Sequence, residues 1–172
     1  MIAISGSAAL AATVIFTCGM VLVAILDLTT MKIPNRIVLS LLAAYLVFAP
    51  LAGFGPMAIG SDLVAALSVL AGTFLFFILG WLGGGDSKLA AVSALWIGTD
   101  NVLAYLLYTA VFGGVLTVVL LKFRAMVLPP NWLGAPWLAR LHSPNAGVPY
   151  GIALASAALF VFPHTPWMSA LT

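Results

Sequence analysis

Long apolar runs, separated by short groups of turn residues, make up most of this sequence. They predict six helices, at residues 8–26, 36–52, 62–82, 88–98, 102–122 and 148–163. A helix that crosses a bilayer needs about 20 apolar residues. The run at 88–98 would rise only about 16 Å against a hydrocarbon core of about 30 Å, so we expect the connection before it to lie at membrane depth. The pattern predicts an all-α, polytopic membrane protein with about six transmembrane helices.

Composition supports lipid as the main solvent of the chain. Of its 172 residues 64% are hydrophobic and only 6% are charged, with a mean hydropathy of +1.23. About a quarter of the residues in a soluble domain are charged. We therefore expect one membrane-embedded domain over residues 1–172, in contact with lipid and without a nucleic-acid partner. The single cysteine, Cys18, excludes an internal disulfide and a multi-cysteine zinc site.

The basic residues orient the six predicted helices. All of them fall in connections on one side of the membrane: Lys32, Arg36, Lys88, Lys122, Arg124 and Arg140. The opposite connections, at 53–61 and 99–101, contain none, and neither does either end of the chain. Because cytoplasmic loops carry the excess of Lys and Arg, the basic side is predicted to be cytosolic, with both termini on the outer side.

One long connection, at 123–147, has a distinct composition. It contains four prolines and two tryptophans: Pro129, Pro130, Pro136, Pro144, Trp132 and Trp137. Prolines prevent a long helix, and tryptophan suits the level of the lipid headgroups. We expect a loop that lies on the cytosolic interface.

Two of the four acids have a structural explanation in the sequence. A carboxylate at mid-membrane costs roughly 2.5–3.5 kcal/mol on insertion scales, so each one needs a reason. Asp62 and Asp100 follow Ser61 and Thr99 at predicted helix starts on the outer side. Acids there can cap free N–H groups and meet the positive end of the helix dipole, so both are predicted to be helix caps.

Asp27 and Asp86 have no comparable explanation. Asp27 ends the first helix, where the dipole disfavours an acid, although an acid in a water-exposed loop is an alternative. Asp86 could cap the next helix, but a cap does not explain the three glycines that precede it, Gly83–Gly85. Glycines there suit either a tight turn or close approach of a substrate backbone. Both acids are predicted at the same cytosolic depth. Two carboxylates that share a site and one proton can activate water for attack on an amide.

Three stretches carry a resemblance to a known family. Asp27-Leu28-Thr29-Thr30-Met31-Lys32-Ile33-Pro34-Asn35 resembles the first aspartate motif of type IV prepilin peptidases, and Gly83-Gly84-Gly85-Asp86-Ser87-Lys88-Leu89 resembles the second, the G-x-G-D motif. Pro149-Tyr150-Gly151 is similar to a further family feature, and the resemblance extends over essentially the whole chain. It implies a membrane aspartic endopeptidase of the bacterial cytoplasmic (inner) membrane. Such enzymes remove the leader of type IV prepilins at the cytosolic face, before the hydrophobic segment of the pilin.

The resemblance also implies roles for individual residues. It gives Asp27 and Asp86 as the catalytic pair, with no cofactor and no metal. Substrate positioning falls to these residues: Gly83, Gly84, Gly85, Lys88, Pro34 and Asn35. Lys88 either biases the ionisation of Asp86 or anchors its helix at the headgroups. Larger members carry a cysteine-containing cytosolic domain that methylates the product. This chain lacks that domain and resembles the compact tight-adherence (Flp) branch.

Two other classes of function stay open. A small transporter or channel subunit would use Asp27 and Asp86 as proton or ion sites, but such acids usually lie near the bilayer midplane rather than at the cytosolic ends of helices. A catalytically silent assembly factor of a pilus machine would not need an intact pair of acids. The sequence identifies neither the pilin substrate nor the oligomeric state.

Overall fold

The computed structural model describes residues 2–129 and 134–171, and within these ranges it is built from helices without a strand. The all-α prediction is confirmed. The helices, in chain order, are α1 (Ile2–Thr30), α2 (Asn35–Leu51), α3 (Pro56–Ile78), α4 (Gly84–Ile97), α5 (Val102–Ala125), α7 (Pro136–His142), α8 (Tyr150–Val161), η1 (Phe162–His164) and α9 (Pro166–Ser169).

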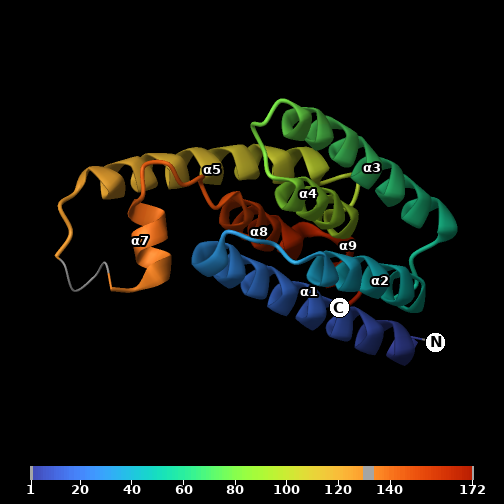
Figure 1. The fold of residues 1–172 in the computed structure, drawn as a ribbon. Coiled ribbons are helices and arrows are strands. Elements are labelled where there is room, and N and C mark those ends of the chain that lie inside the picture. Colours follow the sequence, from blue (N-terminus) through green and yellow to red (C-terminus); the bar gives the residue numbers. More distant parts are fainter. Residues whose placement is uncertain (1, 130–133, 172) are drawn as a thin grey trace.

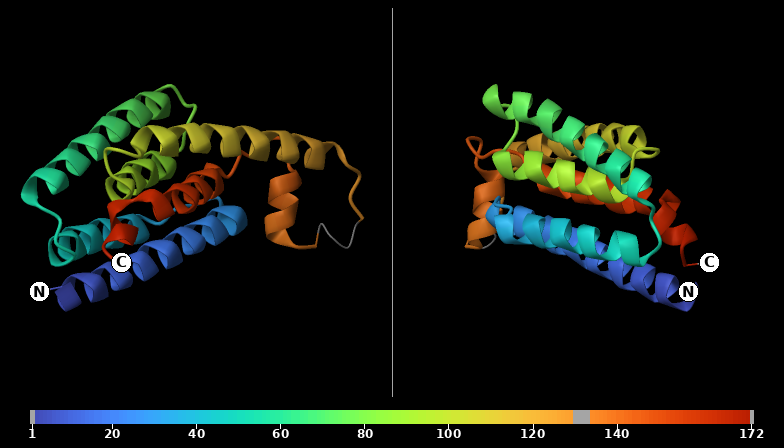
Figure 2. Two further views of the ribbon diagram at one scale, coloured as in Figure 1. Left: turned by 180° about the vertical axis from the view of Figure 1, so that it is seen from behind. Right: turned by 90° about the vertical axis from the view of Figure 1, so that its right-hand side faces the viewer.

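Two short helices, α4 and α8, form the centre of the bundle. α4 packs against α3, α8, α2 and α5, and α8 also packs against α1 and α5 (Figures 1 and 2). Ten of the 14 residues of α4 are buried. α4 is shorter than a lipid-exposed span would be. Burial explains this length, because protein rather than lipid covers most of the helix.

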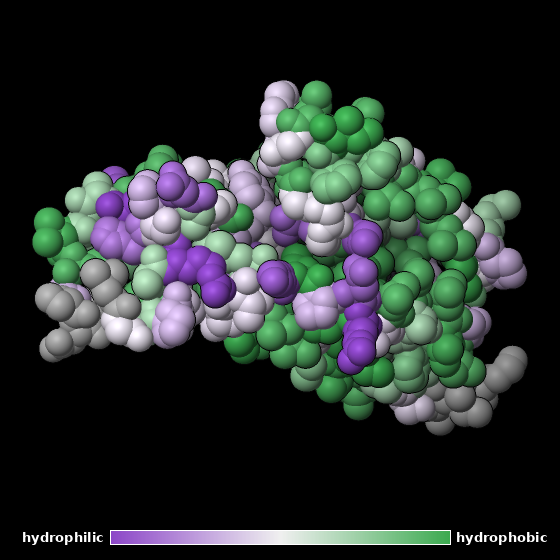
Figure 3. All heavy atoms as spheres, in the orientation of Figure 1, coloured by the Kyte–Doolittle hydropathy of each residue, from purple (hydrophilic) through white to green (hydrophobic). Residues whose placement is uncertain are grey.

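Three longer helices lie around this centre and are suited to a bilayer. Gly6–Thr30, Pro56–Ile78 and Val102–Ala125 are long and apolar enough to cross a membrane, and Asn35–Leu51 and Tyr150–His164 are shorter apolar segments. Figure 3 shows apolar residues over most of the visible face, with polar residues gathered near α7 and in a band beside the centre. The chain is thus a helical membrane protein, and the count of six spans stays a prediction.

Both ends of the chain lie at the same end of the bundle. The start of α1 is close to α9 in all three views (Figures 1 and 2), and an ideal Cβ on Gly6 would lie 3.9 Å from the carbonyl oxygen of Ala170. The C-terminal end of α1 and α7 lie at the opposite end. This arrangement agrees with termini on one side of a membrane, and the outer side stays a prediction.

The predicted caps at Asp62 and Asp100 are wrong. α3 begins at Pro56 instead of residue 62, so Asp62 lies inside this helix. Proline is favoured in the first helical turn because it needs no N–H donor there, and it marks the start that the sequence reading missed. Asp100 lies in the turn before α5, whose N-cap position is Asn101; the Asn101 amide donates to the His164 carbonyl at 3.3 Å.

The predicted loop at 123–147 is only partly a loop. α5 continues to Ala125, and Pro136 opens the seven-residue helix α7, while Pro130 and Trp132 lie outside the described residues. Arg140 Nη1 donates to the Thr29 carbonyl at 3.0 Å. Arg124 donates from Nε to the Leu141 carbonyl at 2.9 Å and from Nη2 to the Gly147 carbonyl at 2.8 Å. Two arginines thus tie this segment to the C-terminal ends of α1 and α5.

Candidate active site

A cavity of about 500 Å³ opens where α1 ends and α4 begins. The side chains of Asp27 and Asp86 both line it. The other lining residues come from the α3–α4 connection, the end of α1 and the segment that enters α8: Met31, Gly80, Trp81, Leu82, Gly83, Gly147, Val148 and Tyr150. The structure therefore brings together the two acids that the helix directions predicted to lie at one depth.

Asp27 lies in the last turn of α1 and is 4% exposed. The N–H groups of Gly151 and Ile152, in the first turn of α8, face its carboxylate. The N-terminus of a helix favours negative charge, so α8 offsets the unfavourable end of the α1 dipole. Within the described part of the chain Asp27 Oδ2 has no hydrogen-bond partner. This oxygen is buried against the start of α8, beside Gly151.

Asp86 is fixed by the first turn of α4. Its carboxylate turns back toward the N–H of Gly83, the N-cap residue of α4, as an acid at the third helical position does in a capping box. A Cβ on Gly83 would lie 2.7 Å from Asp86 Oδ2, so glycine is required there. Ser87 Oγ donates to the Thr73 carbonyl at 3.2 Å and fastens this turn to α3. Asp86 both caps α4 and faces the cavity.

The chemistry of the site follows from two acids in one cavity. The carboxylates of Asp27 and Asp86 lie close enough to repel each other electrostatically. No Lys, Arg or His is among the described residues that line the cavity. Two carboxylates that share a site do not both ionise easily, and this arrangement suits a pair that acts as acid and base. In the described ranges no three His, Cys, Asp or Glu side chains form a cluster that could hold a metal ion.

The three glycines before Asp86 do not form one loop, contrary to the sequence reading. Gly84 and Gly85 belong to the first turn of α4, and only Gly83 lines the cavity. A Cβ on Gly84 would lie 3.2 Å from the ring of Phe77, and one on Gly85 would lie 3.2 Å from Ile33 Cβ. The two helical glycines therefore allow the start of α4 to pack closely against its neighbours.

The remaining predicted site residues lie outside the cavity. Lys88 Nζ donates to Asn35 Oδ1 at 3.1 Å, and both residues line a separate, mainly apolar cavity of about 310 Å³. Pro34 is the N-cap residue of α2. The structure thus joins Lys88 and Asn35 to each other rather than to the acids. The substrate-positioning roles of all three residues stay predictions.

Sequence reasoning missed the part that α8 plays in the site. A Cβ on Gly151 would lie 2.7 Å from Asp27 Oδ2, so this glycine lets the carboxylate approach the start of α8. The motif Pro149-Tyr150-Gly151 pointed to the start of α8, but the sequence analysis assigned it no contact with Asp27. Trp81, 72% exposed, was also missed, because a lone tryptophan near a helix end is ordinary at a membrane interface.

Comparison with known proteins supports one family. Neither the comparison with curated proteins nor that with solved structures gives a match. A family model described as the type IV leader peptidase family matches residues 14–118, a range that includes both acids but is shorter than the resemblance drawn from the motifs. This range is more than half of the chain. Since its helices are also those of a membrane protein, the chain is a membrane peptidase that belongs to the type IV leader peptidase family.

Proposed function

We propose that the chain is an aspartic endopeptidase that removes the leader peptide of prepilins, with Asp27 and Asp86 as its catalytic pair. The observation that carries this proposal is the single cavity lined by both acids in a chain of a leader-peptidase family. Asp27 comes from the last turn of α1 and Asp86 from the first turn of α4, so neither lies in the middle of a helix. This placement disfavours the transporter or channel alternative, since acids that carry ions usually lie near the bilayer midplane.

The pair supplies the groups that hydrolysis of an amide requires. The ionised carboxylate accepts a proton from a water molecule as the water oxygen attacks the carbonyl carbon of the scissile bond. The protonated carboxyl group donates a hydrogen bond to the carbonyl oxygen, and a proton then passes to the departing nitrogen as the C–N bond breaks. Both carboxylates line the cavity in which that water would lie.

The proposed location is the cytosolic face of a bacterial inner membrane, with a prepilin of the tight-adherence (Flp) type as substrate. Support comes from the basic residues: Arg140 bonds the Thr29 carbonyl, two residues after Asp27, so basic side chains and the acid cavity share one end of the bundle. Basic residues mark the cytosolic side. The leader of a membrane-inserted prepilin reaches this depth, where it would pass Gly83.

Co-expression with candidate prepilins tests the proposal. The wild-type chain should convert one of them to its mature size, and sequencing of the product should place the cut just before the hydrophobic segment. Reporter fusions after Arg36 and after Arg140 should report the cytosol. Absence of cleavage for every Flp-type and type IV prepilin tested, with the protein inserted, would contradict the proposed substrate class.

A further inference from the structure

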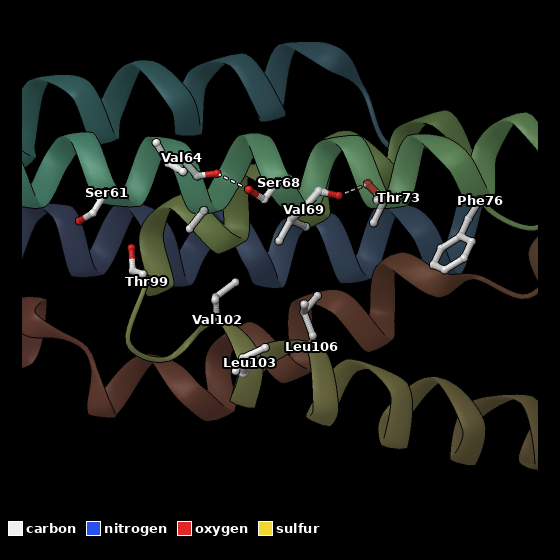
Figure 4. Close-up of a pocket in the computed structure, with 12 residues that line it drawn as sticks. Ser61, Val64, Ser68, Val69, Thr73, Phe76, Thr99, Val102, Leu103 and Leu106 are labelled. Atoms are coloured by element: carbon white, nitrogen blue, oxygen red, sulfur yellow. Dashed lines mark hydrogen bonds between the residues drawn. The ribbon is translucent and has the colours of Figure 1, made fainter.

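An open groove separates α3 from α5 on the side of α3 that faces away from α2. It has a volume of about 720 Å³ and is lined mainly by apolar side chains, as Figure 4 shows. Val64 and Leu103 on its two rims are 65% and 78% exposed, while Val69 is buried. α3 packs mainly against α4, and α5 packs mainly against α8, so these two helices leave the space between them open.

The polar groups of the groove are already satisfied within α3. Ser68 Oγ donates to the Val64 carbonyl and Thr73 Oγ1 donates to the Val69 carbonyl, each at 2.8 Å (Figure 4). The wall is therefore effectively apolar. A Cβ on Gly72 would meet nothing within 4 Å, so the groove is open at this point. Small residues of this kind let a second helix approach closely within a membrane.

The groove leads to the acid cavity. Ser61 and Thr99 lie at one end and Phe76 at the other (Figure 4). The ring of Phe76 stacks on that of Trp81 with centroids 5.9 Å apart, and Trp81 lines the cavity with the two acids. From residue 61 to residue 76 a helix rises about 22 Å, which is the length of about 15 helical residues of a partner.

A second groove on the other side of α3 is less suited to an apolar helix. Its volume is about 630 Å³, and it is lined by Leu67 and also by Lys88, whose charge an apolar partner would have to cover. At its α4 end the ring of Phe77 lies against Gly84. The α3–α5 groove has neither the charge nor this obstruction.

We infer that the α3–α5 groove holds the hydrophobic N-terminal segment of the prepilin as a helix, with its leader junction passing Trp81 into the cavity of Asp27 and Asp86. This inference rests on the proposed function. Backbone polar groups in lipid must be paired internally, which requires the bound segment to be helical. Apolar contacts along the groove would fix the depth of the segment, and the scissile bond would then lie beside the acids.

A matched pair of glycine substitutions tests the groove. Gly72→Leu places a side chain in the groove, and Gly114→Leu places one on α5 outside it; an added Cβ meets nothing within 4 Å at either position. Initial cleavage rates should fall about tenfold for Gly72→Leu, because the added side chain occupies the space proposed for the substrate helix, and Gly114→Leu should stay near wild type.

Cysteine cross-linking locates the bound segment directly. Phe76→Cys on the groove and Phe74→Cys on the other side of α3 are matched, with wild-type exposures of 48% and 50%. Both are made in a Cys18→Ala, Asp27→Asn background, because Cys18 is exposed and the substrate must stay uncleaved. A cysteine in the hydrophobic segment of the prepilin should cross-link to residue 76 and not to residue 74.

Two results would overturn the inference while wild type cleaves. One is wild-type cleavage by Gly72→Leu, and the other is cross-linking through residue 74 in preference to residue 76. Absence of cleavage by wild type would instead overturn the proposed function, and the groove inference with it. The two failures are thus distinguishable.

Discussion

Two buried acid sites lie near opposite ends of α4, and they differ in how their oxygens are bonded. Asp62 is 8% exposed and Asp27 is 4% exposed, so burial does not separate them. Both oxygens of Asp62 are partnered: the Tyr45 hydroxyl donates to Oδ2 at 2.6 Å, and the Thr99 N–H donates to Oδ1 at 3.1 Å. Asp27 Oδ2 has no partner in the described part of the chain and belongs to an acid that lines a cavity. Hydrogen bonding, rather than burial, separates the two acids.

The Asp62 site joins elements instead of opening to a substrate. Its bonds link α2, α3 and the turn between α4 and α5. Gly98 in that turn has a φ of +81°, and a Cβ there would lie 3.3 Å from Asp62 Oδ1, so glycine is favoured on both grounds. Beside it the Trp96 indole donates to the Leu41 carbonyl and the Trp167 indole donates to the Trp96 carbonyl, each at 3.0 Å. These hydrogen bonds connect the C-terminal end of α4 to its neighbours, so its role is structural.

The largest expected effect separates the two sites by activity. Asp27→Asn and Asp86→Asn should each lower the initial cleavage rate by at least about a hundredfold, since each removes a proton-transfer group. Asp62→Asn should keep most of the activity, because an amide oxygen still accepts from Thr99. The measurement is cleavage of a prepilin by purified protein in lipid. If Asp62→Asn lost as much cleavage activity as the other two variants, the two acid sites would not differ in function.

An intermediate effect is expected where α8 meets Asp27. Gly151→Ala adds a Cβ that would lie 2.7 Å from Oδ2, so the carboxylate must move and cleavage should fall by about tenfold. Gly147→Ala is the control, because Gly147 lines the same cavity and a Cβ there meets nothing within 4 Å. Both rates are measured at matched amounts of folded protein. Equal activities would show that the contact with α8 does not position Asp27.

The smallest expected effect concerns stability. Here substitution at the Asp62 site should have the larger effect, whereas substitution at the Asp27 site has the larger effect on activity. Tyr45→Phe leaves Asp62 Oδ2 without its hydroxyl partner and should lower the free energy of unfolding by about 1–3 kcal/mol. Asp27→Asn should cause a smaller loss, because Oδ2 of Asp27 accepts no comparable side-chain hydrogen bond in the described part of the chain. Reversible unfolding in mixed micelles measures both. A larger loss in Asp27→Asn than in Tyr45→Phe would contradict the comparison.

Features that depend on neighbouring residues along the chain could be predicted from the sequence. Apolar runs gave the positions of α1 to α5 and α8 with ends that differ by up to six residues, because length and hydropathy decide which segments are helical in lipid. Helix direction alone brought Asp27 and Asp86 to one depth. α7 was missed because its seven residues are held by hydrogen bonds of Arg124 and of its own Arg140 rather than by an apolar pattern.

Features that depend on distant partners could not be predicted. Asp62 was assigned as a cap because Ser61 precedes it, whereas its partners Tyr45 and Thr99 lie 17 and 37 residues away. Gly84 and Gly85 suggested a loop, yet contacts with Phe77 and Ile33 make glycine suitable within a helix. In each case local sequence allowed two conformations, and packing between elements selected the one observed.

The three hydrogen bonds by which two arginines hold the 123–147 segment end on main-chain carbonyls, at Thr29, Leu141 and Gly147. A main-chain oxygen is present whatever side chain a residue carries. Replacement of Thr29 or Leu141 therefore keeps the acceptor, whereas replacement of Arg124 or Arg140 by an uncharged residue removes the donor. Mutational tolerance is thus asymmetric: much of this segment can change its sequence, and its attachment beside the cavity depends on two positions.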